Sequence, residues 1–164
     1  MAGKRPARRW RRETRPLSDR LSPICKTPAE ILTDLMDGHN EALLGGAERG
    51  KKYLLKYGER NSSIPNAVKF FLFDLLAEDA YQSDDLETCR TAVARASDYL
   101  AAAREARLQR FRDYIPSIRF YERGIALFID EGEFEKALSL CDQAIALGFD
   151  KVYAAKRASI ERMM

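Results

Sequence analysis

Two helical patterns separated by a single glycine occupy the last third of the chain, and this spacing leaves few folds open to it. Pro116 disfavours helical backbone at the residue before it, so a helix is expected to begin there. Gly132 interrupts the apolar spacing, and Gly148 stands where helices commonly end in a left-handed residue. We therefore predict helices of roughly 116–131 and 133–147 that pack as an antiparallel pair.

Similar helix signals recur from residue 27 onward. Thr27, Pro28 and Glu30 form a capping box with proline at the first helical position, where its missing N–H costs nothing. Pro65 opens a helix that is apolar nearly all round, which predicts that this helix is the most buried. Strands are indicated by runs of alternating apolar and polar residues that are bounded by pairs of turn-forming residues, and the sequence has no such runs. The last helix is opened by Asp150, and its predicted inward residues are Val152, Ala155, Ala158 and Ile160.

A long helix is predicted after Ser83, Asp84 and Asp85, which provide a cap and charges that oppose the helix dipole. Its apolar stripe mixes large and small side chains, and small side chains let a neighbouring helix approach closely. The stripe consists of Leu86, Cys89, Val93, Ala96, Leu100 and Ala103.

Eight residues within 118–151 follow a spacing of large and small side chains that is typical of helical repeats. Alanines seven apart on the second helix leave space for aromatic rings of the first helix. The residues are Tyr121, Gly124, Ile125 and Phe128 in the first helix, and Ala137, Cys141, Ala144 and Phe149 in and after the second. This spacing resembles the tetratricopeptide repeat, a helix–turn–helix unit, over 34 of the 164 residues.

The sequence departs from the pattern of that family at three places. Gly124 and Ile125 exchange its large and small positions, Cys141 replaces an aromatic residue, and Phe149 replaces the terminal proline. The helices of 65–113 look like a second pair with an overlong second arm. We therefore predict an antiparallel helix-pair stack, which is either a short tetratricopeptide-like solenoid or an irregular helical bundle.

The resemblance implies a peptide-binding groove lined by the first helix of the unit. Members of the family that clamp a peptide's C-terminal carboxylate use Lys and Asn at the positions of Glu122 and Ala126, so we expect no such clamp here. A mixed-charge or partly apolar helix or extended peptide is the ligand that the resemblance implies. The residues expected to face the groove are Arg119, Glu122, Ala126, Ile129 and Asp130.

Residues 1–26 form a basic arm that we expect to be flexible when free. The first 20 residues carry eight Lys and Arg against two acidic residues, whereas the remaining 144 carry 20 basic and 23 acidic residues. Arginines neutralise phosphates while an indole ring stacks on a base, so the arm is a candidate contact for nucleic acid. The same composition would also suit binding to an acidic protein, a nuclear-targeting signal or an incidental solubilising extension. The candidate residues are Arg8, Arg9, Trp10, Arg11 and Arg12.

The stretch GGAERGKK (45–52) matches the phosphate-binding pattern GxxxxGK up to its last position, where Lys52 replaces the hydroxyl residue that coordinates Mg²⁺. A predicted helix precedes Gly45, whereas the motif needs a strand there. We therefore interpret the stretch as a bend followed by a basic helix, in which Leu54 and Leu55 face inward and the lysines face water.

The residues that most often perform catalysis have simpler interpretations in this sequence. His39 is the only histidine, and we expect it to face solvent late in the first helix. The three cysteines show neither metal nor disulfide spacing, and Cys89 and Cys141 are expected in the core. The acidic pair Glu78-Asp79 falls near a helix end, where solvation or capping explains it.

We conclude that the chain consists of the arm, residues 1–26, and an all-helical domain, residues 27–164. The predicted function is a non-enzymatic protein–protein interaction module or small adaptor, whose partner is another protein or a peptide segment. The alternative is a nucleic-acid-associated protein that binds through the arm. We expect no cofactor, no metal and no membrane span, because the apolar run FFLFDLLA is far shorter than the ~20 residues that a span needs. The expected location is the cytoplasm, or the nucleus if the source is eukaryotic.

Overall fold

The computed structural model describes residues 26–61 and 63–164, and within these ranges the chain forms helices and no strand. The predicted all-α class is confirmed. The α-helices, with one short 3₁₀ helix η2, are α1 (Pro28–Leu43), α2 (Ala47–Arg60), α3 (Asn66–Gln82), α4 (Leu86–Glu105), α5 (Gln109–Tyr114), η2 (Ile115–Ser117), α6 (Phe120–Asp130), α7 (Phe134–Ala146) and α8 (Asp150–Glu161).

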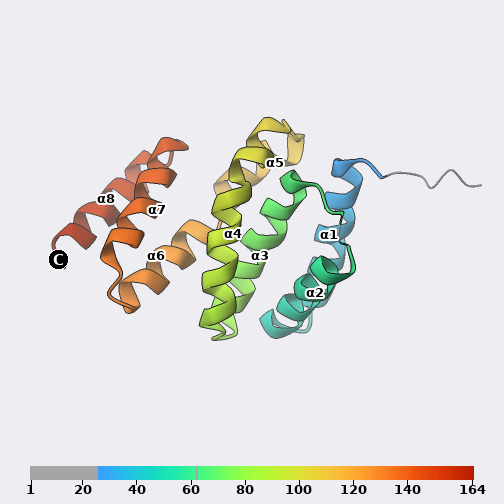
Figure 1. The fold of residues 1–164 in the computed structure, drawn as a ribbon, viewed down its shortest axis with the longest axis horizontal. Helices are drawn as coiled ribbons and strands as arrows, with labels where there is room; N and C mark the ends of the chain where they lie inside the picture. Colours follow the sequence, from blue (N-terminus) through green and yellow to red (C-terminus); the bar gives the residue numbers. More distant parts are fainter. Residues whose placement is uncertain (1–25, 62) are drawn as a thin grey trace, which may run out of the picture.

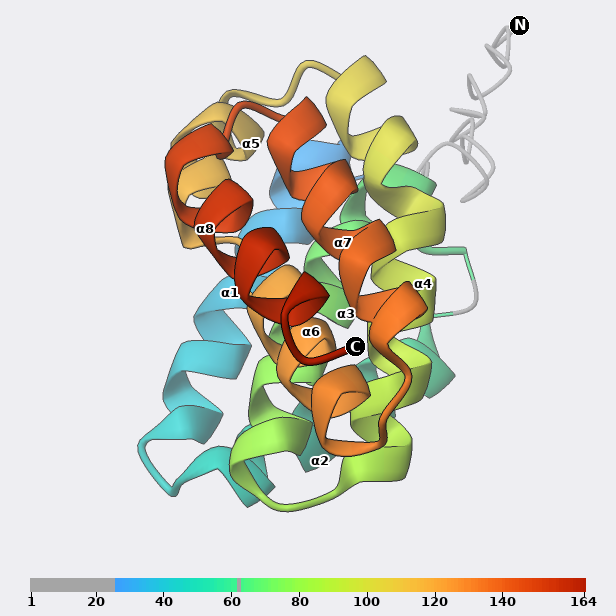
Figure 2. The same cartoon turned by 90° about the vertical axis from the view of Figure 1, so that its left-hand side faces the viewer.

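The helices follow one another along the long axis of the molecule (Figure 1), from α1 and α2 at one end to α7 and α8 at the other. The pairs α1/α2, α3/α4 and α6/α7 each pack together, and the second helix of each pair packs on the next helix of the stack. Figure 2 looks along this stack, with α7 and α8 nearest the viewer. The short α5 and η2 connect α4 to α6. The arrangement is solenoid-like, and each helix packs mainly on its neighbours in sequence.

Local sequence signals explain where several helices begin and end. The capping box is present, because Thr27 Oγ1 accepts a bond from the Glu30 N–H at 3.3 Å and Glu30 accepts one from the Thr27 N–H at 2.7 Å. Asp85 caps α4 by accepting a bond from the Thr88 N–H at 3.1 Å. Gly132 and Gly148 adopt φ angles of 72° and 99° directly after α6 and α7, as expected for helix stops.

The helix α3 lies at the centre of one continuous apolar core that extends along the stack. Phe70 and Phe71 are fully buried, and both meet the ring of Phe111 edge to face, with centroids 5.7 and 6.1 Å apart. Phe120 of α6 also packs against Phe70, with centroids 6.1 Å apart. The prediction that this helix is the most buried agrees with these contacts, which join α3 to α5 and α6.

Asp74 interrupts the apolar run of α3, yet its side chain is completely buried. Its carboxyl group accepts bonds from the backbone N–H groups of Arg119 at 3.0 Å and Phe120 at 2.8 Å, and from the Tyr114 hydroxyl at 2.6 Å. No side chain of α6 itself caps this end. Asp74 therefore caps α6 from another helix, and α6 begins at Phe120 instead of the predicted Pro116, which lies in η2.

The predicted register of α8 is wrong for three of its four inward residues. Ile160 is buried as expected, but Val152, Ala155 and Ala158 are exposed. Tyr153 is buried instead, and its ring packs against Tyr121 at 6.0 Å and Phe149 at 5.9 Å between centroids. The large aromatic ring fixes the rotation of α8, because it buries far more apolar area than the alanines would.

We predict that Asp74→Asn flattens the pH dependence of folding stability. Burial raises the pKa of Asp74 from 3.8 to about 6, although its hydrogen-bond donors oppose the shift. The protonated carboxyl group therefore contributes stability that is present below pH 3.8 and is lost as the pH rises through about 6. Urea unfolding from pH 4 to pH 7 should show the wild type losing about 2 kcal/mol relative to the variant. Parallel curves would contradict the prediction.

We also predict opposite effects of removing two buried tyrosine hydroxyls. Among the described residues, the Tyr121 hydroxyl is the one buried side-chain polar atom without a hydrogen-bond partner, whereas the Tyr114 hydroxyl donates to Asp74. Tyr121→Phe should leave the free energy of unfolding unchanged or raise it by up to about 1 kcal/mol. The matched variant Tyr114→Phe should lower it by about 2 kcal/mol, because Asp74 loses a donor. Thermal and urea unfolding measure both, and equal losses would refute the assignment.

Candidate functional site

Three of the five residues predicted to face a groove on α6 line one shallow pocket. Glu122, Ala126 and Ile129 border a hollow of about 260 Å³ between α6 and α8. Arg119, just before α6, and Asp130, at its end, are exposed but do not line the hollow. The remaining lining residues are Arg123, Ile125, Lys156, Ser159, Ile160 and Met163.

The charged groups at this hollow are largely engaged within the protein. Lys156 Nζ lies 3.9 Å from Glu122 Oε1. The Arg123 guanidinium binds both carboxylate oxygens of Glu78 on α3, at 2.7 and 3.0 Å, and covers the ring of Tyr81. Burial alone would raise the pKa of Glu78. The hydrogen bonds and positive charge of Arg123 have the opposite effect, and the pKa is lowered. Little charge is left over for a ligand on this side.

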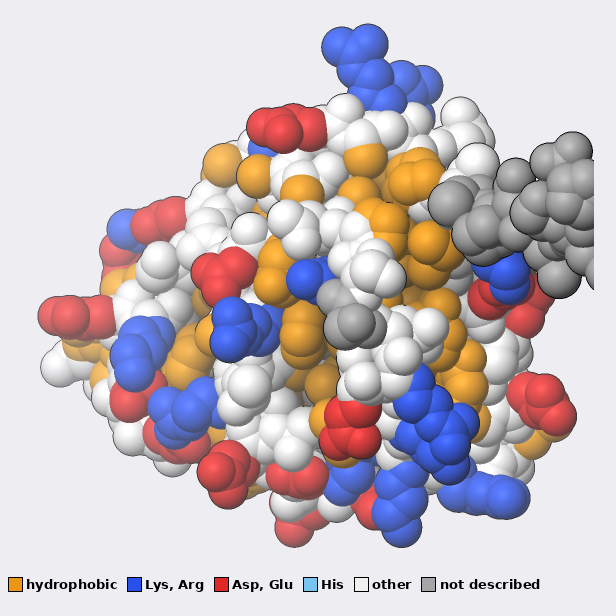
Figure 3. Space-filling view, turned by 45° about the vertical axis from the view of Figure 1, so that its right-hand side comes forward, with side chains coloured by type: hydrophobic (Ala, Val, Ile, Leu, Met, Phe, Trp, Pro, Cys, Tyr) orange, Lys and Arg blue, Asp and Glu red, His pale blue; other side chains and the backbone are white. Residues whose placement is uncertain are grey.

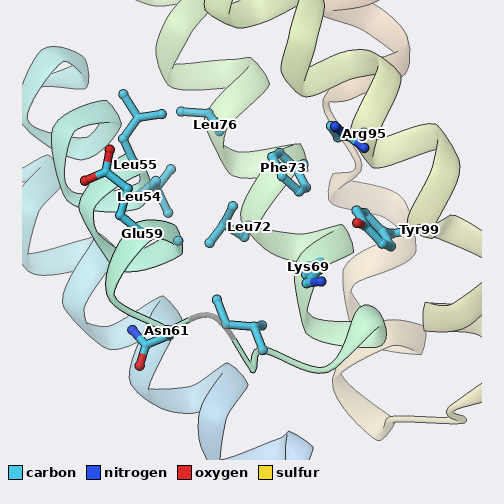
Figure 4. A pocket seen from close by; sticks show the side chains of 12 residues that line it. Leu54, Leu55, Glu59, Asn61, Lys69, Leu72, Phe73, Leu76, Arg95 and Tyr99 are labelled. Atoms are coloured by element: carbon cyan, nitrogen blue, oxygen red, sulfur yellow. The ribbon is translucent and has the colours of Figure 1, made fainter.

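A larger pocket, of about 440 Å³, opens between α2, α3 and α4 (Figure 4). Leucines of α2 and α3 form its floor and one wall, and aromatic rings of α3 and α4 form the other wall. On the face in Figure 3, apolar side chains lie in hollows of the surface with both basic and acidic side chains around them. The main apolar lining residues are Leu54, Leu55, Leu72, Phe73, Leu76 and Tyr99.

The aromatic wall of this pocket is an ordered stack. The rings of Phe73 and Tyr99 are nearly parallel, with an interplanar angle of 8° and centroids 5.8 Å apart. Lys69 places its ammonium group 5.3 Å from the centre of the Tyr99 ring. Arg95 lies on this side of the pocket, and Glu59 lies on the opposite side, on α2 (Figure 4).

The sequence interpretation missed this pocket because it assigned both leucines of α2 to the core. Leu54 is fully buried, but Leu55 remains 40% exposed at the pocket. The signal was present in α3, whose apolar surface extends nearly all round. Its neighbours α2 and α4 cover that surface incompletely, and the pocket is the uncovered part.

The GxxxxGK-like stretch serves the packing of α1, α2 and α3. Gly46, with φ 95°, forms the turn between α1 and α2. A Cβ atom at Gly50 would overlap the carboxylate of Asp79, so glycine allows α2 to approach α3 closely.

Contrary to the expectation that the lysines face water, Lys51 is only 8% exposed, and its ammonium group binds Asp85 at 3.0 Å and Glu48 at 2.8 Å. Both hydrogen bonds raise the pKa of Lys51, and the bond with Glu48 has the larger effect.

His39 does not face solvent as predicted. It is 3% exposed, and its Nε2 lies 2.7 Å from Oδ2 of Asp79, which is 2% exposed. The pair connects α1 to α3 beneath Gly50 of α2. Asp79 therefore binds a partner in the core, whereas the sequence interpretation assigned it to solvation or capping. A buried, directly paired histidine joins helices without reaching either pocket.

The described cysteines occupy the core as predicted. Cys89 and Cys141 are fully buried, and burial raises the pKa of Cys89 to about 11 and also raises that of Cys141. Both groups are therefore held as thiols, which are poor nucleophiles. Over 26–61 and 63–164, no group of three or more His, Cys, Asp and Glu side chains has an arrangement that would hold a metal ion. Within the same ranges, none of the helices has the length and apolar character to cross a membrane.

The predicted contact residues of the arm, and Cys25, lie outside the described residues. These contact residues are Arg8, Arg9, Trp10, Arg11 and Arg12. Comparison of the chain with family models, curated proteins and solved structures finds no match in any of the three.

We predict that Lys51 acts in folding and that nucleotides do not bind through it. Lys51→Met should lower the free energy of unfolding by about 1 kcal/mol, a modest loss because Glu48 and Asp85 lie partly in solvent. The matched control Lys52→Met, whose side chain is 72% exposed, should change it much less. Millimolar Mg-ATP or Mg-GTP should leave the melting temperature of all three proteins unchanged. A nucleotide-dependent rise that Lys51→Met removes would support a phosphate-binding site instead.

Proposed function

We propose that this protein is a protein-interaction module that binds a segment of a partner protein between α2, α3 and α4. The proposed activity is binding without catalysis. The observation that carries it is the open pocket of about 440 Å³, in which Leu55 stays exposed across from the stacked rings of Phe73 and Tyr99. Its volume falls in the range of ligand-binding pockets, and its lining is mainly leucine and aromatic, as such pockets usually are.

The rigid setting of the pocket supports this proposal. The floor residues Leu72 and Leu76 belong to α3, which packs along α4 and contacts α1, α2 and α6. The buried Lys51 joins α2 to the start of α4 through its bond with Asp85. Because the walls are already in place, a partner would not have to order them on binding, and this lowers the cost of association.

The resemblance to tetratricopeptide repeats is a further reason for the proposal. Tyr121 of α6 and Ala137 and Ala144 of α7 are fully buried. Gly124 lets α6 approach its neighbours, because a Cβ atom there would come within 2.7 Å of both Val93 and Leu140. This packing fits the helix–turn–helix unit that the resemblance implies. We propose the hollow between α6 and α8 as a second, smaller contact surface.

The proposal predicts that a charge placed in the larger pocket prevents partner binding. Leu55→Asp should reduce retention of the partner at least about tenfold, because the carboxylate would have to be desolvated against leucine and aromatic side chains. Leu44→Asp is the matched control, since Leu44 is 89% exposed in the turn after α1 and does not line the pocket. The measurement is affinity capture with the full chain and quantification of retained polypeptides.

Circular dichroism and thermal unfolding should show that both variants keep the fold, because both substitutions are at exposed positions. Polypeptides retained by the wild type and Leu44→Asp but lost with Leu55→Asp support the pocket. Identical retention by all three proteins would contradict it. Retention of nucleic acid that disappears on deletion of residues 1–20 would instead favour the alternative function, binding through the basic arm.

A further inference from the structure

Two cationic side chains line one wall of the larger pocket. Lys69 of α3 and Arg95 of α4 both line it, and neither forms an ion pair with another described residue. The positive charge at this wall is therefore available to a ligand.

The two cations are also well placed to act together with the apolar lining. The Lys69 ammonium lies over the Tyr99 ring, whose face attracts it but accepts no strong hydrogen bond from it. Arg95 is exposed, and its planar guanidinium suits two-point binding of a carboxylate. Leu72 and Leu76 lie on the floor between this wall and α2 (Figure 4). An acidic group and a bulky apolar group of one ligand thus find adjacent sites.

The acidic residue at the pocket restricts where a negative ligand group can lie. Glu59 is on α2, across the pocket from Lys69 and Arg95 (Figure 4). A carboxylate is therefore favoured against α3 and α4 and disfavoured against α2. A basic segment would meet two cations and one anion, so the charges of the lining select against it.

We infer that the occupant of this pocket is an acidic segment of a partner protein, which places bulky apolar side chains against the leucines and its carboxylates against Lys69 and Arg95. This inference rests on the proposed function and adds the chemical class of the partner. The apolar contacts supply most of the affinity, and the charges supply selectivity and speed of association.

Selection from a phage-displayed library of random short peptides tests the inference. The bait is the full chain, and Leu55→Asp is the parallel bait for subtraction. Peptides enriched on the wild type but not on Leu55→Asp should combine aromatic or leucine residues with a net negative charge. If Leu55-dependent peptides are neutral or basic, the inference is overturned while the proposed function stands. If no enrichment depends on Leu55, both are overturned.

Charge removal on an enriched synthetic peptide gives the second readout. Lys69→Gln and Arg95→Gln should each weaken its binding about fivefold to tenfold in fluorescence anisotropy, and added salt should reduce the affinity of the wild type. Arg162→Gln, at an exposed position beyond α8, is the matched control and should have no effect. Equal affinities of the wild type, Lys69→Gln and Arg95→Gln would overturn the inference even for an acidic peptide.

Discussion

The buried carboxyl group of Asp74 determines the path of the chain after α4. It belongs to α3 but binds the first N–H groups of α6, 45 and 46 residues later, and the hydroxyl group of Tyr114 in between. Without it, those N–H groups would be unpaired at the edge of the core, because Arg119 offers no cap. The position of α6, and of α7 and α8 beyond it, therefore depends on one side chain of α3.

Two further acidic side chains of α3, one turn after Asp74, also bind residues of neighbouring helices. Glu78 binds Arg123 of α6, and Asp79 binds His39 of α1. Apolar packing alone accepts several relative rotations of neighbouring helices, whereas these polar pairs are satisfied in one arrangement. The helix with the most buried residues thus also aligns its neighbours on both sides, and the pocket walls of α2 and α4 lie against it.

Most helix positions and stops were predictable because their causes are local, but the start of α6 was not, because it depends on Asp74 of α3. Thr27 and Glu30 lie three residues apart, and Gly132 and Gly148 act on the helices directly before them. The partner of His39, in contrast, lies 40 residues away, so no spacing in the sequence marks it. The rotation of α8 and the exposure of Leu55 depend on the surfaces that neighbouring helices leave uncovered. Both features depend on how the helices pack together, so no single segment of the sequence indicates them.

The linear order of the helices has a consequence for how the protein opens. Opening α8 breaks mainly its packing on α7 and the contact of Tyr153 with Tyr121, whereas freeing α3 means separating α1, α2, α4 and α6 from it. Amide hydrogens of α8 can therefore exchange with solvent through a local fluctuation, and those of α3 require nearly global unfolding. The floor of the larger pocket belongs to α3, so local opening of α8 leaves this floor intact.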